Sequence, residues 1–308
     1  MVKYVLGHKS PDTDSIVSAI MYSRLLNKLG KEAKAIKLGK INNETKFLLE
    51  TTNFEIPETF ETLASGSEII LVDHNERKQT IDNFEELNLV EIIDHHKVTL
   101  NTSSPLWIRT EIIGSTASII TKMFFEKNID IEENEAKLLI GAILSDTLHY
   151  RSPTTTDSDK ELVEALNEIA QIDDIEKFAN DLFAAKSDLG NISAEDLIKL
   201  DYKNYEFGGE TFGIGVVETT NPNYTLSRKS ELIEKMMEIK KKDNLKGIIF
   251  SIIDILAGKN TNIYSDEFEK DLVTKVFDAK ELEENVMDLG EIISRKKQMI
   301  PKLEVYFN

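Results

Sequence analysis

The sequence predicts an α/β fold arranged in two domains. Its 308 residues exceed the length of one average domain, and 41% of them are hydrophobic, which is enough for a core in each. Short apolar runs alternate with stretches of helical spacing in the first half, as in βα units. We therefore expect an N-terminal, mostly parallel β-sheet flanked by helices, and a smaller C-terminal α/β domain with a mixed sheet.

The N-terminal elements follow from this alternation. Between the first two apolar runs, Ile16, Ile20 and Leu25 form one face of a helix that ends at Gly30, a residue suited to a helix C-terminus. From about residue 116 the pattern is predominantly helical. The predicted strands are 2–6, 33–38, 68–72 and 90–93, and the later helices are 117–126, 132–144, 156–169 and 175–186.

A polar, glycine-containing stretch at 187–193 separates this pattern from a different one. We place the N-terminal domain at 1–187, a linker at 188–194 and the C-terminal domain at 195–308. Beyond the linker the sequence predicts a β-hairpin, two helices and further strands. The hairpin covers 202–207 and 211–218, the helices cover 230–242 and 266–276, and the strands are 247–255 and 262–264.

Composition excludes several classes of protein. There are 55 acidic against 37 basic residues, a formal charge of -18, whereas binding to a nucleic-acid backbone needs a basic face. The chain has no cysteine, so disulfides and thiolate metal ligands are excluded. It shows no signal-peptide pattern and no apolar run near the ~20 residues that a membrane helix needs. We expect a cytoplasmic protein with neither a nucleic-acid nor a membrane partner.

Three of the predicted strands end in residues that bind metals. Four of the five histidines lie at these strand ends, in the segments Gly7-His8, Asp73-His74-Asn75 and Asp94-His95-His96. Asp12 or Asp14, taken singly, is more often a turn or cap residue than a ligand, and for Asp73 the two roles are about equally frequent. Asp146 alone would be an ordinary residue near a helix end. Together they indicate a divalent metal site at the edge of the sheet where the strands end.

The ordered motifs of the chain resemble the family II, manganese-dependent inorganic pyrophosphatases of the DHH phosphoesterase superfamily. The resemblance covers almost the whole chain. The triplet Asp94-His95-His96 marks only the superfamily, whereas its combination with the terminal Ser-Arg-Lys is more specific. The motifs are Gly-His-Lys-Ser-Pro-Asp-Thr-Asp-Ser at 7–15, Asp-His-Asn-Glu at 73–76, Asp-His-His at 94–96, Ser-Asp at 145–146 and Ser-Arg-Lys-Lys-Gln at 294–298.

The resemblance implies a role for each matching residue. One metal is assigned to His8, Asp12 and Asp73, and the second to Asp14, Asp73, His95 and Asp146, so that Asp73 bridges the two. His96 is implied to lie near the bridging oxygen of the substrate, and His96, Arg295 and Lys296 are the implied catalytic residues. The implied substrate-binding residues are His96, Lys203, Ser294, Arg295 and Lys296.

The implied reaction is hydrolysis of inorganic pyrophosphate to two phosphates by a water or hydroxide shared between two metals. Mixed imidazole and carboxylate ligands suit Mn²⁺ or Co²⁺ better than an all-oxygen site would. The expectation is two Mn²⁺ per subunit, with Co²⁺ as a substitute and additional Mg²⁺ or Mn²⁺ brought with the substrate. The resemblance also implies an active site in the cleft between the domains, a substrate-binding C-terminal domain of the DHHA2 type, and a homodimer formed through the N-terminal domain.

Two other functions stay open. The first is a nuclease or phosphodiesterase of the same superfamily, whose C-terminal domain carries a Gly-Gly-Gly-His type motif. Here Gly208-Gly209 is followed by Glu210, and no histidine follows His149. The second is a non-catalytic metal- or phosphate-binding protein. Lys203 and Arg295, taken singly, are more often surface charges, and only the resemblance reverses that; the roles of His74, His149 and Arg151 are open.

Overall fold

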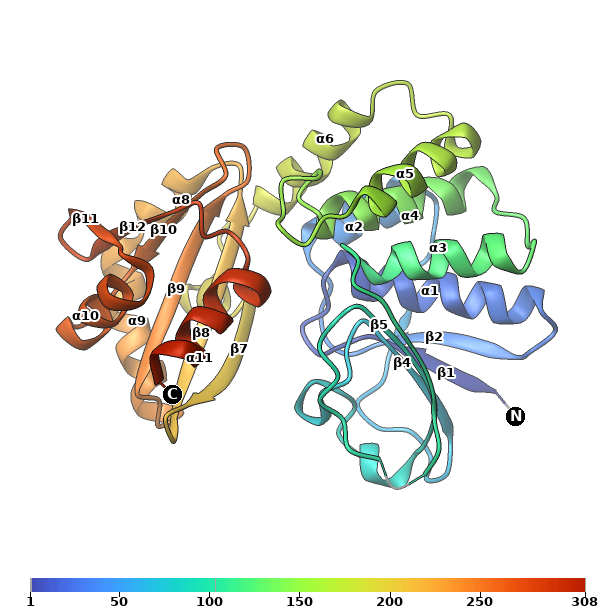
Figure 1. Cartoon of the computed structure of the whole chain (residues 1–308), viewed down its shortest axis with the longest axis horizontal. Coiled ribbons are helices and arrows are strands. Elements are labelled where there is room, and N and C mark those ends of the chain that lie inside the picture. Colours follow the sequence, from blue (N-terminus) through green and yellow to red (C-terminus); the bar gives the residue numbers. More distant parts are fainter. Residues whose placement is uncertain (1, 103, 308) are drawn as a thin grey trace. The chain divides into compact units, whose positions relative to one another are not determined.

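The computed structural model describes residues 2–102 and 104–307, which form two compact units, Met1–Ala185 and Lys186–Asn308. Each unit is an α/β structure built on one six-stranded sheet (Figure 1). The sheet of the first unit is parallel and that of the second is mixed, so the predicted fold class is confirmed.

The N-terminal sheet has the strand order β3-β2-β1-β4-β5-β6, with every neighbouring pair parallel. The four predicted strands are its centre. The prediction missed both edge strands, because β3 has only two residues and the side chains of β6 are mostly exposed. The strands are β1 Lys3–Leu6, β2 Ala33–Lys37, β3 Glu58–Thr59, β4 Glu68–Val72, β5 Asn88–Asp94 and β6 Trp107–Thr110.

Helices α1, α3 and α4 pack side by side in this unit, and α5 packs on α4 (Figure 1). All four were predicted, with ends that differ by at most three residues. The helices are α1 Thr13–Lys28, α2 Asn43–Thr51, α3 Thr116–Glu126, α4 Glu133–Asp146, α5 Asp157–Ala170 and α6 Ile175–Ser187, with 3₁₀ turns η1 Arg77–Gln79 and η2 Phe84–Glu86.

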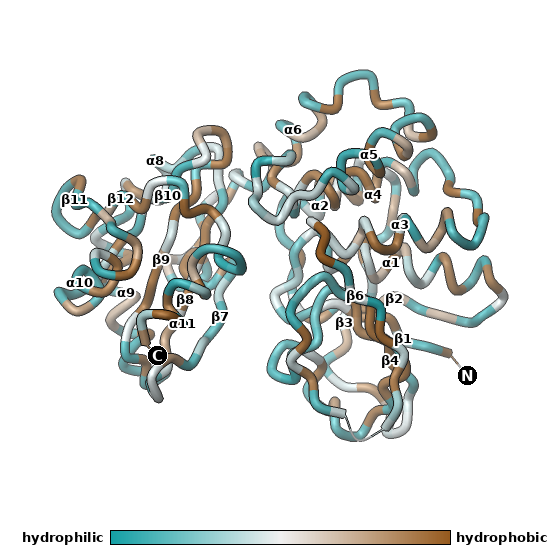
Figure 2. Tube along the Cα trace, in the orientation of Figure 1, coloured by the Kyte–Doolittle hydropathy of each residue, from teal (hydrophilic) through white to brown (hydrophobic). Residues whose placement is uncertain are grey.

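The core of the unit includes apolar side chains from its central strands. Leu6, Ile69, Leu71 and Ile92 form one buried cluster, against which the half-buried Phe84 packs. Figure 2 shows the central strands as hydrophobic along most of their length, whereas the helices alternate between hydrophobic and hydrophilic residues. The sheet is therefore a rigid base for the residues at its strand ends.

The C-terminal sheet has the order β11-β12-β10-β9-β8-β7, in which only β8 and β9 pair in parallel. The predicted hairpin is β7 with β8. Strands β11 and β12 were not predicted; all four residues of β11 are exposed, and they have the charged sequence Lys-Glu-Leu-Glu. The strands are β7 Asp201–Phe207, β8 Glu210–Thr219, β9 Gly247–Asp254, β10 Lys259–Ile263, β11 Lys280–Glu283 and β12 Val286–Gly290.

Five α-helices and a π-helical turn complete the described part of this unit. Residues 188–193, between α6 and α7, form neither helix nor strand. The π-helical turn η3 begins directly after Ser294, inside the Ser-Arg-Lys motif. The helices are α7 Ala194–Ile198, α8 Pro222–Leu226, α9 Lys229–Lys242, α10 Glu267–Phe277 and α11 Ile300–Phe307, and η3 is Arg295–Met299.

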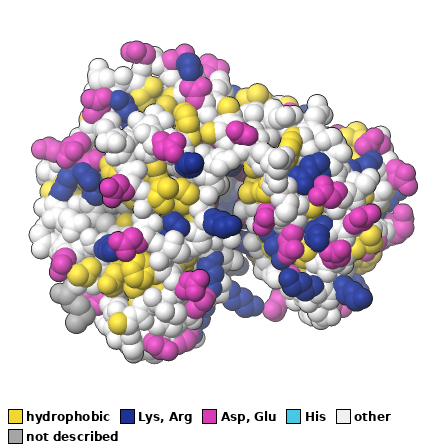
Figure 3. All heavy atoms as spheres, turned by 180° about the vertical axis from the view of Figure 1, so that it is seen from behind, with side chains coloured by type: hydrophobic (Ala, Val, Ile, Leu, Met, Phe, Trp, Pro, Cys, Tyr) yellow, Lys and Arg dark blue, Asp and Glu magenta, His cyan; other side chains and the backbone are white. Residues whose placement is uncertain are grey.

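The surface carries both signs of charge. On the face drawn in Figure 3, acidic and basic side chains are intermixed within each unit. Within residues 2–102 and 104–307, every helix falls short of the length and hydropathy that crossing a bilayer requires.

Candidate functional site

The topology brings the polar strand ends of the N-terminal unit together. Strands β1, β4 and β5 are neighbours and parallel, so Gly7-His8, Asp73 and Asp94-His95-His96 all follow strands at one edge of the sheet. Strand β2 lies on one side of β1 in the sheet, whereas β4 lies on the other side. The strand order therefore reverses at β1, and open α/β sheets bind ligands at such a switch point. Gly7 permits the tight turn, because a Cβ there would lie 1.8 Å from Ser15 Oγ.

The first group of possible ligands consists of His8, Asp12 and Asp73. His8 Nε2 lies 3.5 Å from Asp12 Oδ2 and 3.5 Å from Asp73 Oδ2. Asp12 also caps α1, since its Oδ1 accepts a hydrogen bond from Ser15 N at 2.9 Å. The two oxygens of Asp12 thus serve a structural and a possible ligand role at once.

The second group consists of Asp14, His95 and Asp146. His95 Nε2 lies 3.3 Å from Asp146 Oδ2, at the end of α4. Asp14 is buried in the first turn of α1, and its two oxygens accept hydrogen bonds from Thr116 N at 2.6 Å and Ala117 N at 2.9 Å. The N-terminus of α3 therefore holds this carboxylate in place.

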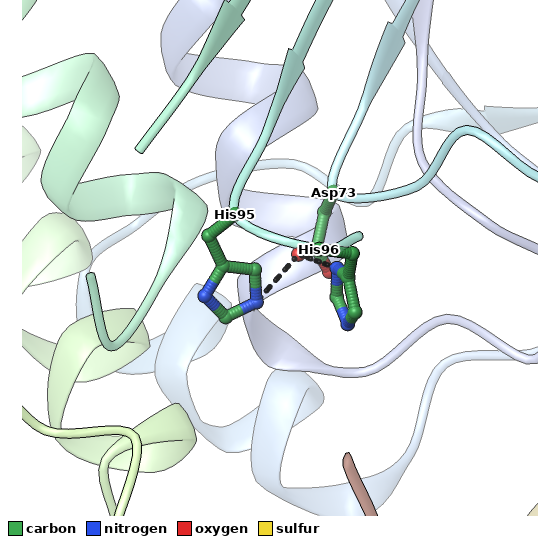
Figure 4. Close-up of side chains that lie close together, drawn as sticks. All are labelled: Asp73, His95 and His96. Carbon is green, nitrogen blue, oxygen red and sulfur yellow. Dashed lines mark ion pairs between the residues drawn. The ribbon is translucent and has the colours of Figure 1, made fainter. Parts of the chain in front are cut away.

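Asp73 links these groups. Its Oδ1 lies 3.4 Å from His95 Nε2 and 3.7 Å from His96 Nδ1, and both histidines point toward it in Figure 4. Its other oxygen faces His8. The backbone of Asp73 has φ 61°, in the left-handed region that aspartate tolerates better than most residues, and this turns the side chain directly after β4.

The donor set fits divalent metal ions. Asp73, His95 and His96 make a third group, and within each of the three groups found among the described residues all ligand atoms lie within 4.8 Å of one another. His8 Nδ1 lies 2.8 Å from Lys9 O and His95 Nδ1 lies 3.0 Å from Ile113 O, so both rings turn Nε2 toward the carboxylates. Backbone carbonyls commonly orient metal-binding histidines in this way.

The electrostatics of the groups also favour a cation. Burial raises the pKa of Asp14 well above its usual range, and the charges of Asp73, Asp146 and Asp12 raise it further. Burial would also raise the pKa of Asp73, but a hydrogen bond from His8 and the charges of His96 and His95 bring this pKa below its usual value. Ions of charge +2 would relieve the repulsion among these carboxylates.

Asp94 is a functional candidate that the sequence reasoning did not include among its site residues. It is buried, and its Oδ1 lies 2.8 Å from His96 Nδ1 and accepts a hydrogen bond from His96 N at 2.9 Å. Asn75 Nδ2 donates to the other oxygen at 2.6 Å. The position of Asp94 at the head of the Asp-His-His triplet was the available signal.

The structure also places the residues whose roles were open. His74 is buried, its Nδ1 lies 2.9 Å from Val72 O, and burial lowers the pKa of its imidazole to about 4. His149 lies in a turn of three residues with positive φ, 148–150, directly beyond α4. Burial and the charge of Arg151 lower the pKa of His149. Neither histidine belongs to the metal-ligand groups found among the described residues.

The expected phosphate-binding residues lie in the C-terminal unit. The Arg295 guanidinium donates to Asp201 O at 2.9 Å and to Asp201 Oδ1 at 2.6 Å. Burial opposes the charge of Arg295, but Asp201 raises its pKa. Lys203 lies two residues after Asp201 on β7, so these side chains share one face of the sheet. Arg295 is thereby placed beside the strand that carries Lys203.

Ser294 and Lys296 belong to the same local structure. Ser294 is buried and caps η3, since its Oγ accepts a hydrogen bond from Lys297 N at 3.3 Å. Lys296 is half-buried in η3 itself. Single π-helical turns are frequent at functional sites, and this one presents the basic residues of the motif from a fixed backbone.

Comparisons with known proteins cover both units. Residues 3–143 match the DHH family, N-terminal domain, and residues 180–306 match the DHHA2 domain. A probable manganese-dependent inorganic pyrophosphatase of Deinococcus radiodurans is 44% identical over 98% of both chains. The manganese-dependent inorganic pyrophosphatase of Methanocaldococcus jannaschii is 40% identical over the full length of both. A crystal structure described as a family II inorganic pyrophosphatase of Methanococcus jannaschii superposes with a TM-score of 0.89, at 39% identity over 99% of each chain.

Proposed function

We infer that this chain, which belongs to the family II manganese-dependent inorganic pyrophosphatases, hydrolyses pyrophosphate by the attack of a metal-activated water on one phosphorus. The chain is an inorganic diphosphatase of the DHH superfamily. Water adds to one phosphorus, the bridging P–O bond breaks, and two phosphates leave. The observation that carries the mechanism is Asp73, whose two oxygens face two different groups of possible ligands.

In this proposal one ion is held by His8, Asp12 and Asp73. The other is held by Asp14, His95 and Asp146 together with Asp73. Two Mn²⁺ ions, with Co²⁺ as a substitute and further Mg²⁺ or Mn²⁺ accompanying the substrate, would lower the pKa of a shared water and neutralise charge on the phosphates. Asp12 and Asp14 are two residues apart in one turn, which lets that turn serve both ions.

The proposed role of His96 is to contact the oxygen that bridges the two phosphorus atoms. Its Nδ1 faces Asp94, so Nε2 is the ring atom left for the substrate. A proton on Nε2 would favour departure of the phosphate as P–O cleavage develops, because the leaving oxygen gains negative charge. Asp94 orients the ring in this arrangement.

The basic residues of the C-terminal unit are proposed to hold the phosphates. Arginine offers a planar fork to phosphate oxygens and lysine a compact charge, and charge stabilisation dominates phosphoryl transfer. Arg295 and Lys203 share one face beside β7, which supports a common anionic ligand. Ser294 and Lys296 complete the proposed set.

A homodimer through the N-terminal unit is also proposed. Strand β6 is an edge strand, and Trp107 and Ile108 on it are 47% and 42% exposed; nearby Ile112 is 91% exposed. Apolar edge strands of this kind are usually covered by a partner. Sedimentation of the wild type should give a dimer, and Ile108→Lys should give a monomer. Val305→Lys, at an 80% exposed apolar residue of the C-terminal unit, is the matched control. A wild-type monomer would contradict the proposal.

The catalytic proposal is tested by phosphate release from pyrophosphate with Mn²⁺, measured beside a short oligonucleotide and a cyclic dinucleotide. Turnover of pyrophosphate alone supports it. Cleavage of either nucleotide without pyrophosphatase activity would overturn it in favour of the phosphodiesterase alternative, and turnover of none of the three would favour a binding protein. The proposed location is the cytoplasm, which fractionation of cells that express the chain would test.

A further inference from the structure

Glu44 is a buried carboxylate that takes part in none of the metal-ligand groups described above. It lies in the first turn of α2 and is 0% exposed. Its Oε2 accepts hydrogen bonds from Thr13 Oγ1 at 2.8 Å and from Ser145 Oγ at 2.8 Å. One oxygen atom of α2 therefore joins the start of α1 to the end of α4.

Each of the two hydroxyl donors directly precedes a carboxylate of the same metal-ligand group. Thr13 directly precedes Asp14, and Ser145 directly precedes Asp146. Asp14 and Asp146 are the two carboxylates of the group that includes His95. The distance between the backbone segments that carry these carboxylates is thus set in part by their common partner, Glu44.

Close packing holds Glu44 where it reaches both hydroxyls. Helix α2 packs on α4 at Gly141, where a Cβ would lie 2.5 Å from Leu48 Cδ1, so a larger residue would push the helices apart. Thr45 Oγ1 lies 3.0 Å from Thr13 Oγ1 and adds a second polar contact between α2 and α1. The link is rigid because its three helices are packed together and the hydrogen bonds are buried.

We propose that Glu44 is a positioning residue that keeps Asp14 and Asp146 at the separation needed to hold one divalent cation. This inference rests on the proposed function, since it takes the Asp14, His95 and Asp146 group as a metal site. Two carboxylates close together in a poorly solvated site repel one another, and hydrogen bonds from the neighbouring residues to one fixed acceptor oppose their separation. Glu44 itself touches neither the cation nor the substrate.

The test compares two substitutions at this position. Glu44→Leu keeps much of the side-chain volume but removes the acceptor, whereas Glu44→Gln keeps a carbonyl oxygen that accepts the same two hydroxyls. We expect Glu44→Leu to bind one of two Mn²⁺ ions about 10- to 100-fold more weakly, the usual effect of losing a partner of a metal ligand. Glu44→Gln should retain most of the affinity. Manganese binding is read by electron paramagnetic resonance without substrate, so the result stands even where pyrophosphate is not hydrolysed.

Glu135→Gln is the matched control. Glu135 is 1% exposed, lies in the same unit and pairs with Arg24 and Lys28. It precedes Asp146 by eleven residues on α4, about 16 Å along the helix. Its loss should leave both Mn²⁺ affinities unchanged.

A folded Glu44→Leu protein with wild-type affinity for both ions, or with equal weakening of both, would overturn the proposal. Should Glu44→Leu fail to fold, Thr13→Val and Ser145→Ala each remove one donor and leave the acceptor. The proposal then requires that each of these two substitutions weakens binding of the same Mn²⁺ ion. Unchanged Mn²⁺ binding in both variants would refute it.

Discussion

The Nδ1 atom of His96 lies 2.8 Å from Oδ1 of Asp94, a buried carboxylate whose second oxygen accepts from Asn75 Nδ2. Burial would raise the pKa of Asp94, but the hydrogen bond and charge of His96 bring it well below its usual range, so the carboxylate stays ionised. An ionised acceptor at this position requires a proton on Nδ1 of His96. Nε2 is then the ring atom that faces the substrate, and the proton that it donates to the leaving oxygen is a second one.

Asp94→Asn should reduce kcat by about 10- to 100-fold. The NH2 group of the new asparagine would have to face either the NH2 group of Asn75 or the Nδ1–H of His96. In each arrangement two hydrogen-bond donors face one another and one hydrogen bond is lost. Steady-state kinetics with pyrophosphate and Mn²⁺ measure the effect. Asp157→Asn, whose side chain is 91% exposed, is the control for loss of one negative charge. Wild-type kcat in Asp94→Asn would show that the ionised carboxylate beside His96 does not contribute to catalysis.

Two substitutions at Asp73 distinguish the contribution of its carboxylate to metal binding from that of its backbone conformation to stability. Asp73→Asn removes the charge but keeps a residue that tolerates φ 61°, and it should lower activity by more than about 10²-fold because a neutral amide with one acceptor oxygen cannot bridge two ions. Asp73→Ala should lose activity similarly and unfold more easily by about 1 kcal/mol, since alanine is strained at positive φ. Calorimetric titration of Asp73→Ala with Mn²⁺ should show weaker binding of both ions. Weaker binding of only one ion in this variant would mean that Asp73 does not bridge.

The sequence predicts the central strands of each sheet better than the edge strands. Strands β4 and β9 are runs of buried Ile, Leu, Val and Phe, whose hydrophobic pattern is unambiguous. Strands β6 and β11 have exposed side chains and owe their existence to pairing with β5 and β12, which a local pattern does not reveal.

The same distinction applies to the site. His8, Asp73 and His95 lie within two residues of the ends of apolar runs, so their convergence is predictable from parallel strands. Glu44 lies inside α2, and its partners are 31 and 101 residues away in the sequence. Its role depends on how three helices pack, and its own neighbours in the sequence give no sign of it.

Arg295 is expected to bind phosphate while paired with Asp201. Arg295→Ala should raise the KM for pyrophosphate by about 10- to 100-fold, because charged hydrogen bonds contribute about 1.5–3 kcal/mol, and it should leave Mn²⁺ affinity unchanged. Asp201→Asn breaks the ion pair but keeps the guanidinium, so its KM should stay near or below that of the wild type. A KM raised equally in both variants would show that the ion pair, rather than the arginine charge, is what matters.

The lowered pKa of Glu135 makes the stability of the N-terminal unit depend on pH. Burial would raise the pKa of Glu135, but hydrogen bonds from Glu132 N, Lys28 and Arg24 lower it below the usual value near 4.5. Its stabilising contribution is therefore complete above about pH 4.5 and is lost as the pH falls through the lower folded-state pKa.

At pH 7 in the presence of a chelator, Glu135→Gln should lower the free energy of unfolding by about 1–3 kcal/mol. The difference from the wild type should shrink as the pH falls below about 4.5, because the unfolded chain takes up the Glu135 proton first and the wild type loses the contribution that the variant already lacks. Urea unfolding followed by fluorescence reports on this unit specifically, since the one tryptophan, Trp107, belongs to it. A difference that stays constant across this pH range would show that the stabilisation does not depend on the charge of Glu135.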